Sequence, residues 1–259
     1  MEGKRDPYAG MADVYDGMAR DRQVREAYRY WRELLLQCAS ERKLEIRTLV
    51  DLMCGTGNTT IPWTRRAGWR VIGVDRSAAL LRVARAKSDR VRWYRQDVRR
   101  LRLRERADAV TCHFDALNHI LEPGEMQEAF RRVARVLRPG GLFLFDLSTA
   151  AWFRWLDGRD KVSRVGRNFL MASNFYDPKS RIVLFTQHWF VPRGRLYERR
   201  TIAVRERAYP VAEIRAMARA AGFRVLRAEP QWTIGGKAVR RVFVLERRAQ
   251  DPFPPRVHC

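Results

Sequence analysis

The amino-acid sequence predicts an α/β fold, in which a doubly wound parallel sheet carries an antiparallel lid inserted after its fifth strand. Between residues 46 and 148, short apolar runs alternate with amphipathic stretches, as is typical of βαβ units with helices on both faces of a sheet. After Ala151 this alternation stops, and three β-rich segments follow one another with short turns between them. Such a succession indicates an antiparallel meander, and hence an insertion or lid.

Five strands of the sheet are expected before the lid: IRTLVDL (46–52), WRVIGVD (69–75), RVRWYRQD (90–97), RADAVTCHF (106–114) and LFLFDLS (142–148). The segments between them predict helices over 58–67, over 77–87 with Ser77 as N-cap, and over 125–138, where Pro139-Gly140-Gly141 should stop the helix. After the lid, the sequence predicts a helix over 210–222 and two further strands over 223–229 and 238–248.

The chain divides into five parts on this basis. Residues 6 to 38 should be helical, because apolar residues recur there at helical spacing. The expected division is an N-terminal helical cap (1–40), a ligand-binding core (41–150), the lid (151–208), the C-terminal helix with the last two strands of the core (209–248), and a proline-rich tail (249–259).

Composition limits the classes of protein that remain. No apolar run approaches the roughly 18 residues that a membrane-spanning helix needs, and the N-terminus lacks an apolar signal region. The four cysteines show neither CxxC pairing nor metal-ligand spacing, so we expect a cytoplasmic protein without a metal site. The formal net charge is +23, and all but six of the 52 basic residues are arginines spread along the whole chain. This spread favours a compositional bias over a dedicated nucleic-acid surface, which remains the alternative.

The stretch LVDLMCGTGNTTIP (49–62) predicts a ligand-binding loop after the first strand. Glycines there permit sharp turns and let a ligand approach the backbone closely. A dinucleotide-binding dehydrogenase would need G-x-G-x-x-G, but the third small position is Thr60. The strand also contains Asp51, whose carboxylate would repel a pyrophosphate and attract an ammonium or sulfonium group. The loop therefore favours a different ligand from NAD, although a dehydrogenase is the remaining alternative.

Two more aspartates follow the next strands. Asp75 ends the second strand, where its carboxylate could accept hydrogen bonds from a ribose diol, and Asp97 follows the third strand, where it could accept from an adenine amino group. Each aspartate alone could instead be a helix N-cap, and Asp75 alone would also fit a dinucleotide. Taken in order, the three acidic strand ends match the ammonium, ribose and adenine groups of S-adenosylmethionine.

The chain resembles the class I S-adenosylmethionine-dependent methyltransferases in five segments: VDLMCGTG (50–57), VIGVDRS (71–77), YRQDV (94–98), ADAVTCHFDALNH (107–119) and VLRPGGLFLFDLS (136–148). They occur in that family's order and spacing over about a hundred residues. The resemblance implies a Rossmann-like, seven-stranded sheet whose last strand is reversed, and S-adenosyl-L-methionine as the methyl donor.

The resemblance also implies the residues that bind this donor. It places one group at the methionine end, Asp75 and Arg76 at the ribose, and Gln96, Asp97 and Val98 at the adenine. The group at the methionine end consists of Asp51, Met53, Cys54, Gly55, Thr56 and Gly57. His113 and Phe114 should line the pocket, and Tyr15 should reach it from the N-terminal cap.

The segment after the fourth strand bears on the methyl acceptor. TCHFDALNHI (111–120) contains neither the N/D-P-P-Y/F pattern of enzymes that methylate exocyclic base amines nor a Pro-Cys pair for covalent attack on cytosine. Base methylation in nucleic acid is therefore disfavoured. The cap segment YAGMADVYDGMARD (8–21) and the lid are similar to those of amino-deoxysugar N,N-dimethyltransferases, and more distantly to glycine N-methyltransferase-like enzymes. This similarity implies that Tyr8 or Tyr15, together with His119, faces the reacting amine.

His119 is a reasonable general base, because the pKa of an unperturbed histidine lies near neutrality. Asp115 lies four residues earlier and could orient His119 or bind a cationic substrate. The alternative is that both residues only cap a local helix. Asp115 and Asn118 also stand where the amino-sugar enzymes are expected to have smaller residues. His188 in the lid and AWFRWL (151–156) are expected to be structural, the latter packing the lid onto the core.

The leading hypothesis is therefore methyl transfer from S-adenosylmethionine to a nitrogen or oxygen of a small molecule. The alternatives are a tRNA or rRNA methyltransferase that uses the basic surface, and a cofactor-binding protein without transferase activity. A basic face converging on the mouth of the site would favour the RNA alternative. The sequence leaves open whether the protein is a monomer or a homodimer.

Overall fold

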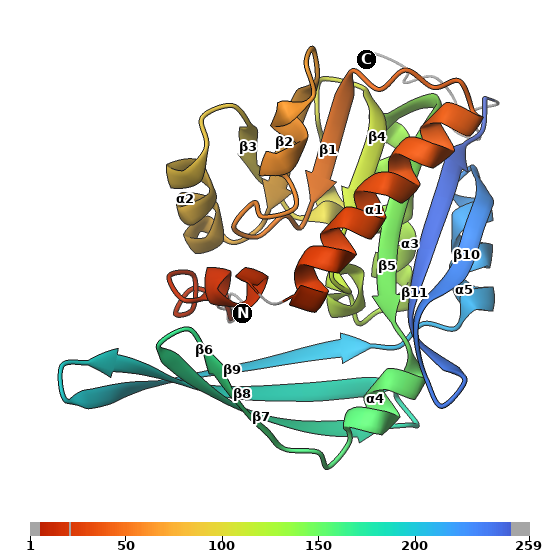
Figure 1. Ribbon diagram of the computed structural model, residues 1–259. Coiled ribbons are helices and arrows are strands. Elements are labelled where there is room, and N and C mark those ends of the chain that lie inside the picture. Colours follow the sequence, from red (N-terminus) through yellow and green to blue (C-terminus); the bar gives the residue numbers. More distant parts are fainter. Residues whose placement is uncertain (1–5, 21, 250–259) are drawn as a thin grey trace.

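Two sheets form the framework of the protein, with the N-terminal segment, residues 6–20, lying between them (Figure 1). The computed structural model describes residues 6–20 and 22–249. The larger sheet has helix α1 (Arg22–Glu41) on one face, and α3 (Pro123–Val136) and α5 (Val211–Ala220) on the other. The smaller sheet is the predicted lid, and it lies across the end of the larger sheet at which β1 and β2 finish.

The larger sheet has seven strands in the order β10-β11-β5-β4-β1-β2-β3. Its strands are β1 (Thr48–Leu52), β2 (Arg70–Asp75), β3 (Arg92–Arg95), β4 (Ala107–Cys112), β5 (Leu137–Ser148), β10 (Phe223–Ile234) and β11 (Lys237–Arg247). The first five are parallel, and β11 runs antiparallel to β5 and to β10. This confirms the predicted doubly wound, Rossmann-like sheet with a reversed last strand. The strand order changes direction between β1 and β4, which is where ligands bind in open α/β sheets.

The two faces of the larger sheet bury separate apolar clusters. On one face, Trp31 and Leu35 of α1 are almost fully buried against Leu49, Val71 and Leu144 of the sheet. On the other face, the core includes Phe130 of α3 and Ile214 of α5, packed with Phe143 and Phe145. Strands buried on both faces read as continuous apolar runs, and this is why they could be recognised in the sequence.

The lid is a four-stranded antiparallel sheet in the order β6-β7-β8-β9. Its strands are β6 (Lys161–Val165), β7 (Asn168–Asp177), β8 (Ile182–Arg193) and β9 (Leu196–Arg207). The sequence predicted three of them and missed β6, a short edge strand whose only apolar residues are two valines. Helix α4 (Ala150–Leu156) joins the lid to the core as expected, because Phe153 is buried against Tyr176, Val183 and Ala208 while the Thr149 hydroxyl donates to the Ala238 carbonyl.

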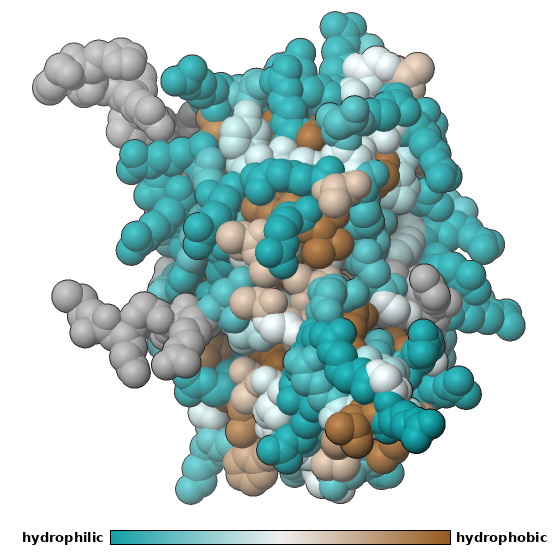
Figure 2. Space-filling view, turned by 90° about the vertical axis from the view of Figure 1, so that its left-hand side faces the viewer, coloured by the Kyte–Doolittle hydropathy of each residue, from teal (hydrophilic) through white to brown (hydrophobic). Residues whose placement is uncertain are grey.

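One face of the lid covers the N-terminal segment and the other is exposed. Trp189 of β8 is fully buried and packs with Met11 and Val14. Neighbouring side chains of a strand point to opposite faces, so apolar residues also occur on the outer face. Figure 2 shows brown patches at its lower end, where the lid lies. The exposed apolar residues of the lid include Val162, Phe169, Met171, Phe175 and Leu196.

The prediction that residues 6–38 are helical is confirmed for 22–38 and wrong for 6–14. The structure has turns up to Val14, a 3-10 helix η1 (Tyr15–Arg20), and then α1. The reason is that the two halves bury different surfaces: Met11 and Val14 pack on the lid, whereas Trp31 packs on the larger sheet. One straight helix could not present both faces to both partners.

Two other helix predictions need correction. The segment 58–67 forms only a short 3-10 helix, η2 (Ile61–Arg65), with Pro62 in its first turn. Pro139-Gly140-Gly141 does not end α3, which stops at Val136; these residues belong to β5, where the pairing with β4 shifts register. Gly140 has a φ of +78°, which glycine adopts without strain. The remaining helix α2 (Ala78–Lys87) begins after Ser77, whose hydroxyl accepts from the Leu80 N–H as predicted. The tail 250–259 lies outside the described residues.

Truncating Trp189 should destabilise the protein strongly. We expect Trp189→Ala to lower the free energy of unfolding by about 3–5 kcal/mol, because a fully buried indole is replaced by a cavity between the lid and the N-terminal segment. The matched control is Phe169→Ala on the outer face of the same sheet, where 39% of the residue is exposed and the loss should stay below about 1 kcal/mol. Urea unfolding checks both values, and equal losses would contradict this packing.

Candidate active site

The carboxyl ends of β1, β2 and β4 converge on the glycine loop, residues 53–60. The N-terminal segment lies directly over this end of the sheet and separates it from the lid (Figure 1). Two 3-10 helices complete the surroundings: η3 (Val98–Arg100) follows β3, and η4 (Ala116–His119) follows β4. The loop, the N-terminal segment, η4 and strand β9 together bound the candidate active site.

The glycine loop has a backbone conformation that requires its glycines. Gly55 and Gly57 have φ values of +55° and +81°, in the left-handed region. A Cβ atom added to Gly57 would lie 2.5 Å from the Trp93 ring, so even alanine would not fit without a shift. Met53 also has a positive φ of 53°, and the Cys54 N–H donates to the Val74 carbonyl at 3.1 Å. The loop is therefore held in a sharply turned form.

Asp51 anchors this loop from below. Its carboxylate is buried, with 1% of the residue exposed, and accepts hydrogen bonds from the hydroxyls of Thr59, Thr60 and Thr111 at 2.7, 2.6 and 2.8 Å. Burial raises the pKa of Asp51, and the three hydroxyls oppose this rise. The sequence assigned Asp51 to the ammonium end of the ligand. In the structure Asp51 also holds the loop in place. Thr60, which stands where a dehydrogenase would have its third glycine, supplies one of the hydrogen bonds.

Asp75 has both the position and the spare hydrogen-bonding capacity that a ribose requires. Its two carboxylate oxygens accept from the backbone N–H groups of Gly55 and Ser77, each at 2.8 Å. A carboxylate offers about four lone-pair sites, so roughly two remain for the hydroxyls of a ligand. Burial raises the pKa of Asp75, while the two N–H groups lower it. Arg76 is exposed beside it.

Asp97 and Gln96 are more fully engaged than the sequence suggested. Asp97 accepts from the Arg99 backbone N–H at 2.9 Å, and from the Arg99 guanidinium at 2.9 and 2.5 Å. Burial acts to raise the pKa of Asp97, but Arg99 outweighs it and keeps the pKa low. The Gln96 side chain bonds to the backbone of Arg102 through both of its polar atoms. Val98 is buried under this corner.

The N-terminal segment is fastened to the glycine loop by Asp16, a residue the sequence did not single out. Asp16 accepts from the Thr56 hydroxyl at 2.5 Å, from the Asn58 amide at 2.9 Å and from Lys87 of α2 at 2.7 Å. Burial acts to raise the pKa of Asp16, but the bond from Lys87 and those from the loop outweigh it and lower the pKa. A second fastening joins Asp6 to the Ser77 hydroxyl at 2.5 Å.

His113 and Phe114 pack against α1. The His113 ring stacks on Trp31 with a centroid distance of 4.4 Å, and Phe114 meets Tyr28 and Trp31 edge to face. Burial lowers the pKa of His113 to about 3, so its imidazole is neutral. Among the described residues its Nδ1 has no hydrogen-bond partner. His113 also lines a small hollow with Tyr28, Asn58 and Thr59, beside the glycine loop.

Tyr8 and His119 meet across the site. The Tyr8 hydroxyl lies 3.1 Å from His119 Nε2, and the Tyr8 ring packs edge to face on both His119 and Tyr15. The other ring nitrogen, Nδ1, lies 3.4 Å from the carbonyl oxygen of Arg205 in β9. Because a carbonyl only accepts, this contact favours the tautomer with its proton on Nδ1, which leaves the Nε2 lone pair for the Tyr8 hydroxyl. The structure thus brings together three residues that the sequence singled out.

Asp115 does not orient His119. It has a left-handed φ of 47° and lies before η4, so the predicted shared helical face is wrong. Its carboxylate accepts from the Ser148 hydroxyl at 2.6 Å and pairs with Arg240 at 3.1 Å. His119 is partly exposed, with 20% of its side-chain surface accessible. Desolvation lowers the pKa of His119, and the charge of Asp115 opposes that shift without any direct contact.

A buried charge cluster that the sequence did not indicate lies behind His119. Arg240 of β11 donates to Asp146 of β5, whose carboxylate also accepts from the backbone N–H groups of Phe114 and Asp115 at 2.8 and 3.0 Å. Burial raises the pKa of Asp146 to about 6, and Arg240 limits this rise. Glu206 of β9 joins the cluster, with Oε1 at 3.6 Å from His119 Nε2. We call Asp115, Asp146, Glu206 and Arg240 the acidic cluster.

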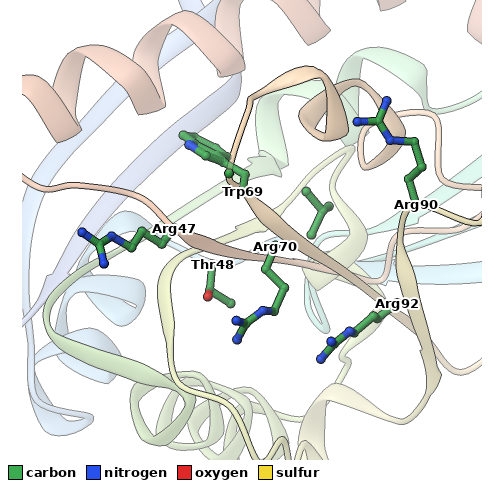
Figure 3. Close-up of a pocket in the computed structure, with 8 residues that line it drawn as sticks. Arg47, Thr48, Trp69, Arg70, Arg90 and Arg92 are labelled. Carbon is green, nitrogen blue, oxygen red and sulfur yellow. The ribbon is translucent and has the colours of Figure 1, made fainter.

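Basic side chains gather at the opposite end of the sheet, where strands β1, β2 and β3 begin. A hollow of about 450 Å³ is lined by Trp69 and four arginines at the start of β1, β2 and β3: Arg47, Arg70, Arg90 and Arg92 (Figure 3). Two of them are ion-paired, Arg47 with Glu45 at 2.8 Å and Arg92 with Glu105 at 2.6 Å. The glycine loop follows the other end of the same strands, so this hollow does not adjoin the Tyr8–His119 pair. It gives no support to a basic face converging on the site.

Comparisons with known proteins identify the class. A family described as "Methyltransferase domain" matches residues 49–141. The cypemycin N-terminal methyltransferase of a Streptomyces species is 31% identical over 199 residues, which cover 74% of this chain and 78% of that protein. The chain therefore belongs to the S-adenosylmethionine-dependent methyltransferases.

Solved structures agree in fold. An S-adenosylmethionine-dependent methyltransferase from Clostridium acetobutylicum superposes with a TM-score of 0.79 at 23% identity, covering 94% of this chain and all of that one. The S-adenosylmethionine-bound structure of CalS10, an amino pentose methyltransferase from Micromonospora echinaspora, superposes with a TM-score of 0.72 at 22% identity, covering 91% and 95%. The antiparallel sheet after β5 corresponds to the expected lid.

The protein is thus an enzyme whose methyl donor is S-adenosyl-L-methionine. The residues at the carboxyl ends of the strands fit this donor, because the loop glycines expose backbone and Asp75 retains lone pairs for a ribose. Within the described part of the chain, no group of three or more His, Cys, Asp or Glu side chains is placed to hold a metal ion. No helix of residues 6–20 and 22–249 is long and apolar enough to span a membrane.

Replacing Asp75 should weaken cofactor binding more than replacing Asp97. We expect Asp75→Ala to raise the Kd for S-adenosylhomocysteine at least roughly tenfold, because the carboxylate that holds the Gly55 N–H, and that we expect to accept from the ribose, is removed. Asp97→Ala should raise it less, because Arg99 occupies most of that carboxylate. Calorimetric titration measures both, with Asp75→Asn as a control of similar size. A larger loss in Asp97→Ala would contradict the assignment.

Proposed function

We propose that the protein transfers the methyl group of S-adenosylmethionine to an amino nitrogen of a small molecule. The observation that carries this proposal is the Tyr8–His119 pair, joined at 3.1 Å between the N-terminal segment and η4. It lies beside the end of the sheet at which the donor binds in this family. A neutral imidazole and a phenol at that place can bind an amine and take its proton.

The charges around the pair favour a cationic acceptor. The acidic cluster contains three carboxyl groups and one guanidinium, and Arg240 is committed to Asp146 and Asp115. Negative charge in a site with little solvent attracts an ammonium group and repels a carboxylate or phosphate. An amine therefore suits this site better than an acidic acceptor.

The chemistry assigned to the chain is limited to binding and proton transfer. When bound, S-adenosylmethionine supplies a methyl group on a sulfonium, which is already activated. The amine must present a free lone pair, so the protein has to remove one proton from the ammonium form. Burial keeps the pKa of His119 low, which leaves Nε2 unprotonated and able to accept that proton. The Tyr8 hydroxyl, which is hydrogen-bonded to His119, can also bind the amine of the acceptor.

Burial also raises the pKa of Tyr8 and of Tyr15, so neither phenol ionises near neutral pH. Burial, and then the charges of Asp115 and Asp75, raise the pKa of Tyr15, which supports a position between the donor end and the acceptor end of the site. We assign Tyr8, Tyr15 and His119 to the acceptor. Asp115 shapes the charge of the site through Arg240.

The relatives support an amine acceptor by what their names state. One is named as a cypemycin N-terminal methyltransferase and another as an amino pentose methyltransferase. The donor site proposed here comprises the glycine loop with Asp51, Asp75 with Arg76, the corner of Gln96, Asp97 and Val98, and the wall of His113 and Phe114. We propose that the lid, residues 151–208, determines the specificity for the acceptor, because its strand β9 carries Arg205 and Glu206 beside His119.

Methyl transfer should require an amino group on the acceptor. We expect product from S-adenosylmethionine with dTDP-3-amino-3,6-dideoxy-α-D-glucopyranose or with a short peptide bearing a free N-terminus. The dTDP-sugar with a hydroxyl in place of the amine, the N-acetylated peptide and a tRNA transcript should yield none. Mass spectrometry of the products decides this. Methylation of the hydroxyl sugar or of tRNA, with none of either amine, would overturn the proposal.

Substitution of the pair should slow transfer without affecting donor binding. We expect His119→Asn to reduce kcat roughly 100-fold or more, the usual effect of losing a positioned base. Tyr8→Phe should have a smaller effect, because it removes only the hydroxyl. The matched control is His188→Asn in β8, since His188 bonds to Thr201 at 2.9 Å on the outer face of the lid. Equal losses in the His188 and His119 variants would contradict the assigned roles.

A further inference from the structure

We propose that Glu206 is the carboxyl group that pairs with the ammonium group of the acceptor and then accepts one of its protons. In the free enzyme Glu206 is neutral. It ionises when the ammonium group of the acceptor arrives, and then takes up a proton from that ammonium group to release the amine lone pair. This inference rests on the proposed function, and Glu206 is a residue that the sequence alone did not indicate.

The geometry of Glu206 carries the proposal. Glu206 lies near the end of β9, and 7% of the residue is exposed. Its Oε1 is 3.6 Å from Nε2 of His119. Its other oxygen, Oε2, is buried and has no hydrogen-bond partner within residues 6–20 and 22–249. Buried carboxyl oxygens in native structures are normally hydrogen-bonded. An unpartnered one beside the proposed general base is therefore an open position for a donor such as an ammonium N–H.

The groups around Glu206 explain why its proton is retained in the free enzyme. His119 lies beside Glu206, and the charged or titratable groups that act on it electrostatically are Asp115, Arg240 of β11, Asp146 of β5, and Tyr8 and Tyr15 of the N-terminal segment. Arg240 is the one cation of the acidic cluster, and it is already paired with Asp146 and Asp115. Burial, and then the charge of Asp115, raise the pKa of Glu206 well above its usual value.

An ammonium group supplies the cation that Glu206 lacks. On binding of R–NH₃⁺, the Glu206 carboxyl releases its proton to solvent and becomes a carboxylate paired with the ammonium. In the next step an N–H proton moves to Glu206, directly or through His119, and the nitrogen keeps the bonding pair. That lone pair forms the N–CH₃ bond as the C–S bond breaks, with its electrons going to sulfur. Each turnover thus releases one proton, at the binding step, and leaves Glu206 neutral again.

Strand β9 both carries Glu206 and orients His119. The Arg205 carbonyl, one residue before Glu206, contacts Nδ1 of His119 and selects the tautomer whose Nε2 faces Glu206. The lid therefore does more than cover the site, because β9 contributes the carboxyl group and orients the imidazole. Removing the charge of Glu206 should affect acceptor chemistry and leave the donor site unchanged.

The first test needs no acceptor. A carboxyl group whose folded pKa is raised above its unfolded value stabilises the fold fully below the unfolded pKa, and this stabilisation is lost as pH rises through the folded pKa. Urea unfolding of wild type and Glu206→Gln from about pH 5 to about pH 9 should therefore show the variant gaining stability relative to wild type as pH rises. A relative loss, or no change with pH, would overturn the proposal.

The matched control for this test is Glu198→Gln in the same strand. Glu198 is exposed and paired with Arg193 and Arg200, which hold its pKa at about 2. A carboxyl group with a depressed folded pKa stabilises above the unfolded pKa and loses this as pH falls through the folded pKa. The Glu198→Gln variant should therefore be less stable than wild type by an amount that does not change over the same pH range. The Glu206→Gln variant, in contrast, should gain stability relative to wild type as pH rises.

The second test uses methyl transfer to dTDP-3-amino-3,6-dideoxy-α-D-glucopyranose as the probe. We expect Glu206→Gln to lower kcat/KM roughly 100-fold, with the acidic limb of the wild-type pH profile abolished and the Kd for S-adenosylhomocysteine unchanged. Glu206→Asp should restore part of the activity and the acidic limb, which a purely structural role would not do. An unchanged pH profile in Glu206→Gln would overturn the proposal. If wild type methylates no amine at all, the proposed function fails, and the unfolding measurement alone decides whether Glu206 holds the proton.

Discussion

The site depends on one constraint: residues 6–20 are held between the glycine loop and the lid. From the loop side, Asp16 receives hydrogen bonds from Thr56, Asn58 and Lys87. From the lid side, Met11 and Val14 pack on the fully buried Trp189. Because both attachments act on one short segment, we propose that the donor site and the acceptor site are coupled through it. Tyr8 owes its position beside His119, and Tyr15 its position beside Tyr8, to these two attachments.

The second structural element of the site is the buried pair of Arg240 and Asp146 on adjacent strands. Asp146 also accepts the N–H groups of Phe114 and Asp115, so it fixes the turn after β4 that leads to His119. An ion pair without solvent is stabilising only when its remaining hydrogen bonds are satisfied, and here several N–H groups do so. Since Arg240 is fully used in this way, the carboxyl group of Glu206 stays without a cation until a ligand brings one.

The sequence predicted the elements whose information is local. The parallel strands are continuous apolar runs, and Asp75 and the loop glycines stand at fixed positions after them, so the fold and the donor could be inferred. The acceptor side could not. Glu206 meets His119 and Arg240 meets Asp146 only because strands distant in sequence are brought together. The left-handed turn at Asp115 also breaks the helical spacing on which its predicted partnership with His119 relied. Asp16 was overlooked because its partners lie on the loop and on α2.

The most direct test of this account is hydrogen–deuterium exchange of the wild-type protein with and without S-adenosylhomocysteine. If the donor lies between the glycine loop and the N-terminal segment, the ligand will slow amide exchange in residues 6–20 and 53–60 together. Exchange on the outer strand β6 of the lid, and around the arginine hollow at Trp69, will then be unchanged. Protection at the loop without any in residues 6–20, or protection centred on the hollow, would contradict the coupling on which the site is built.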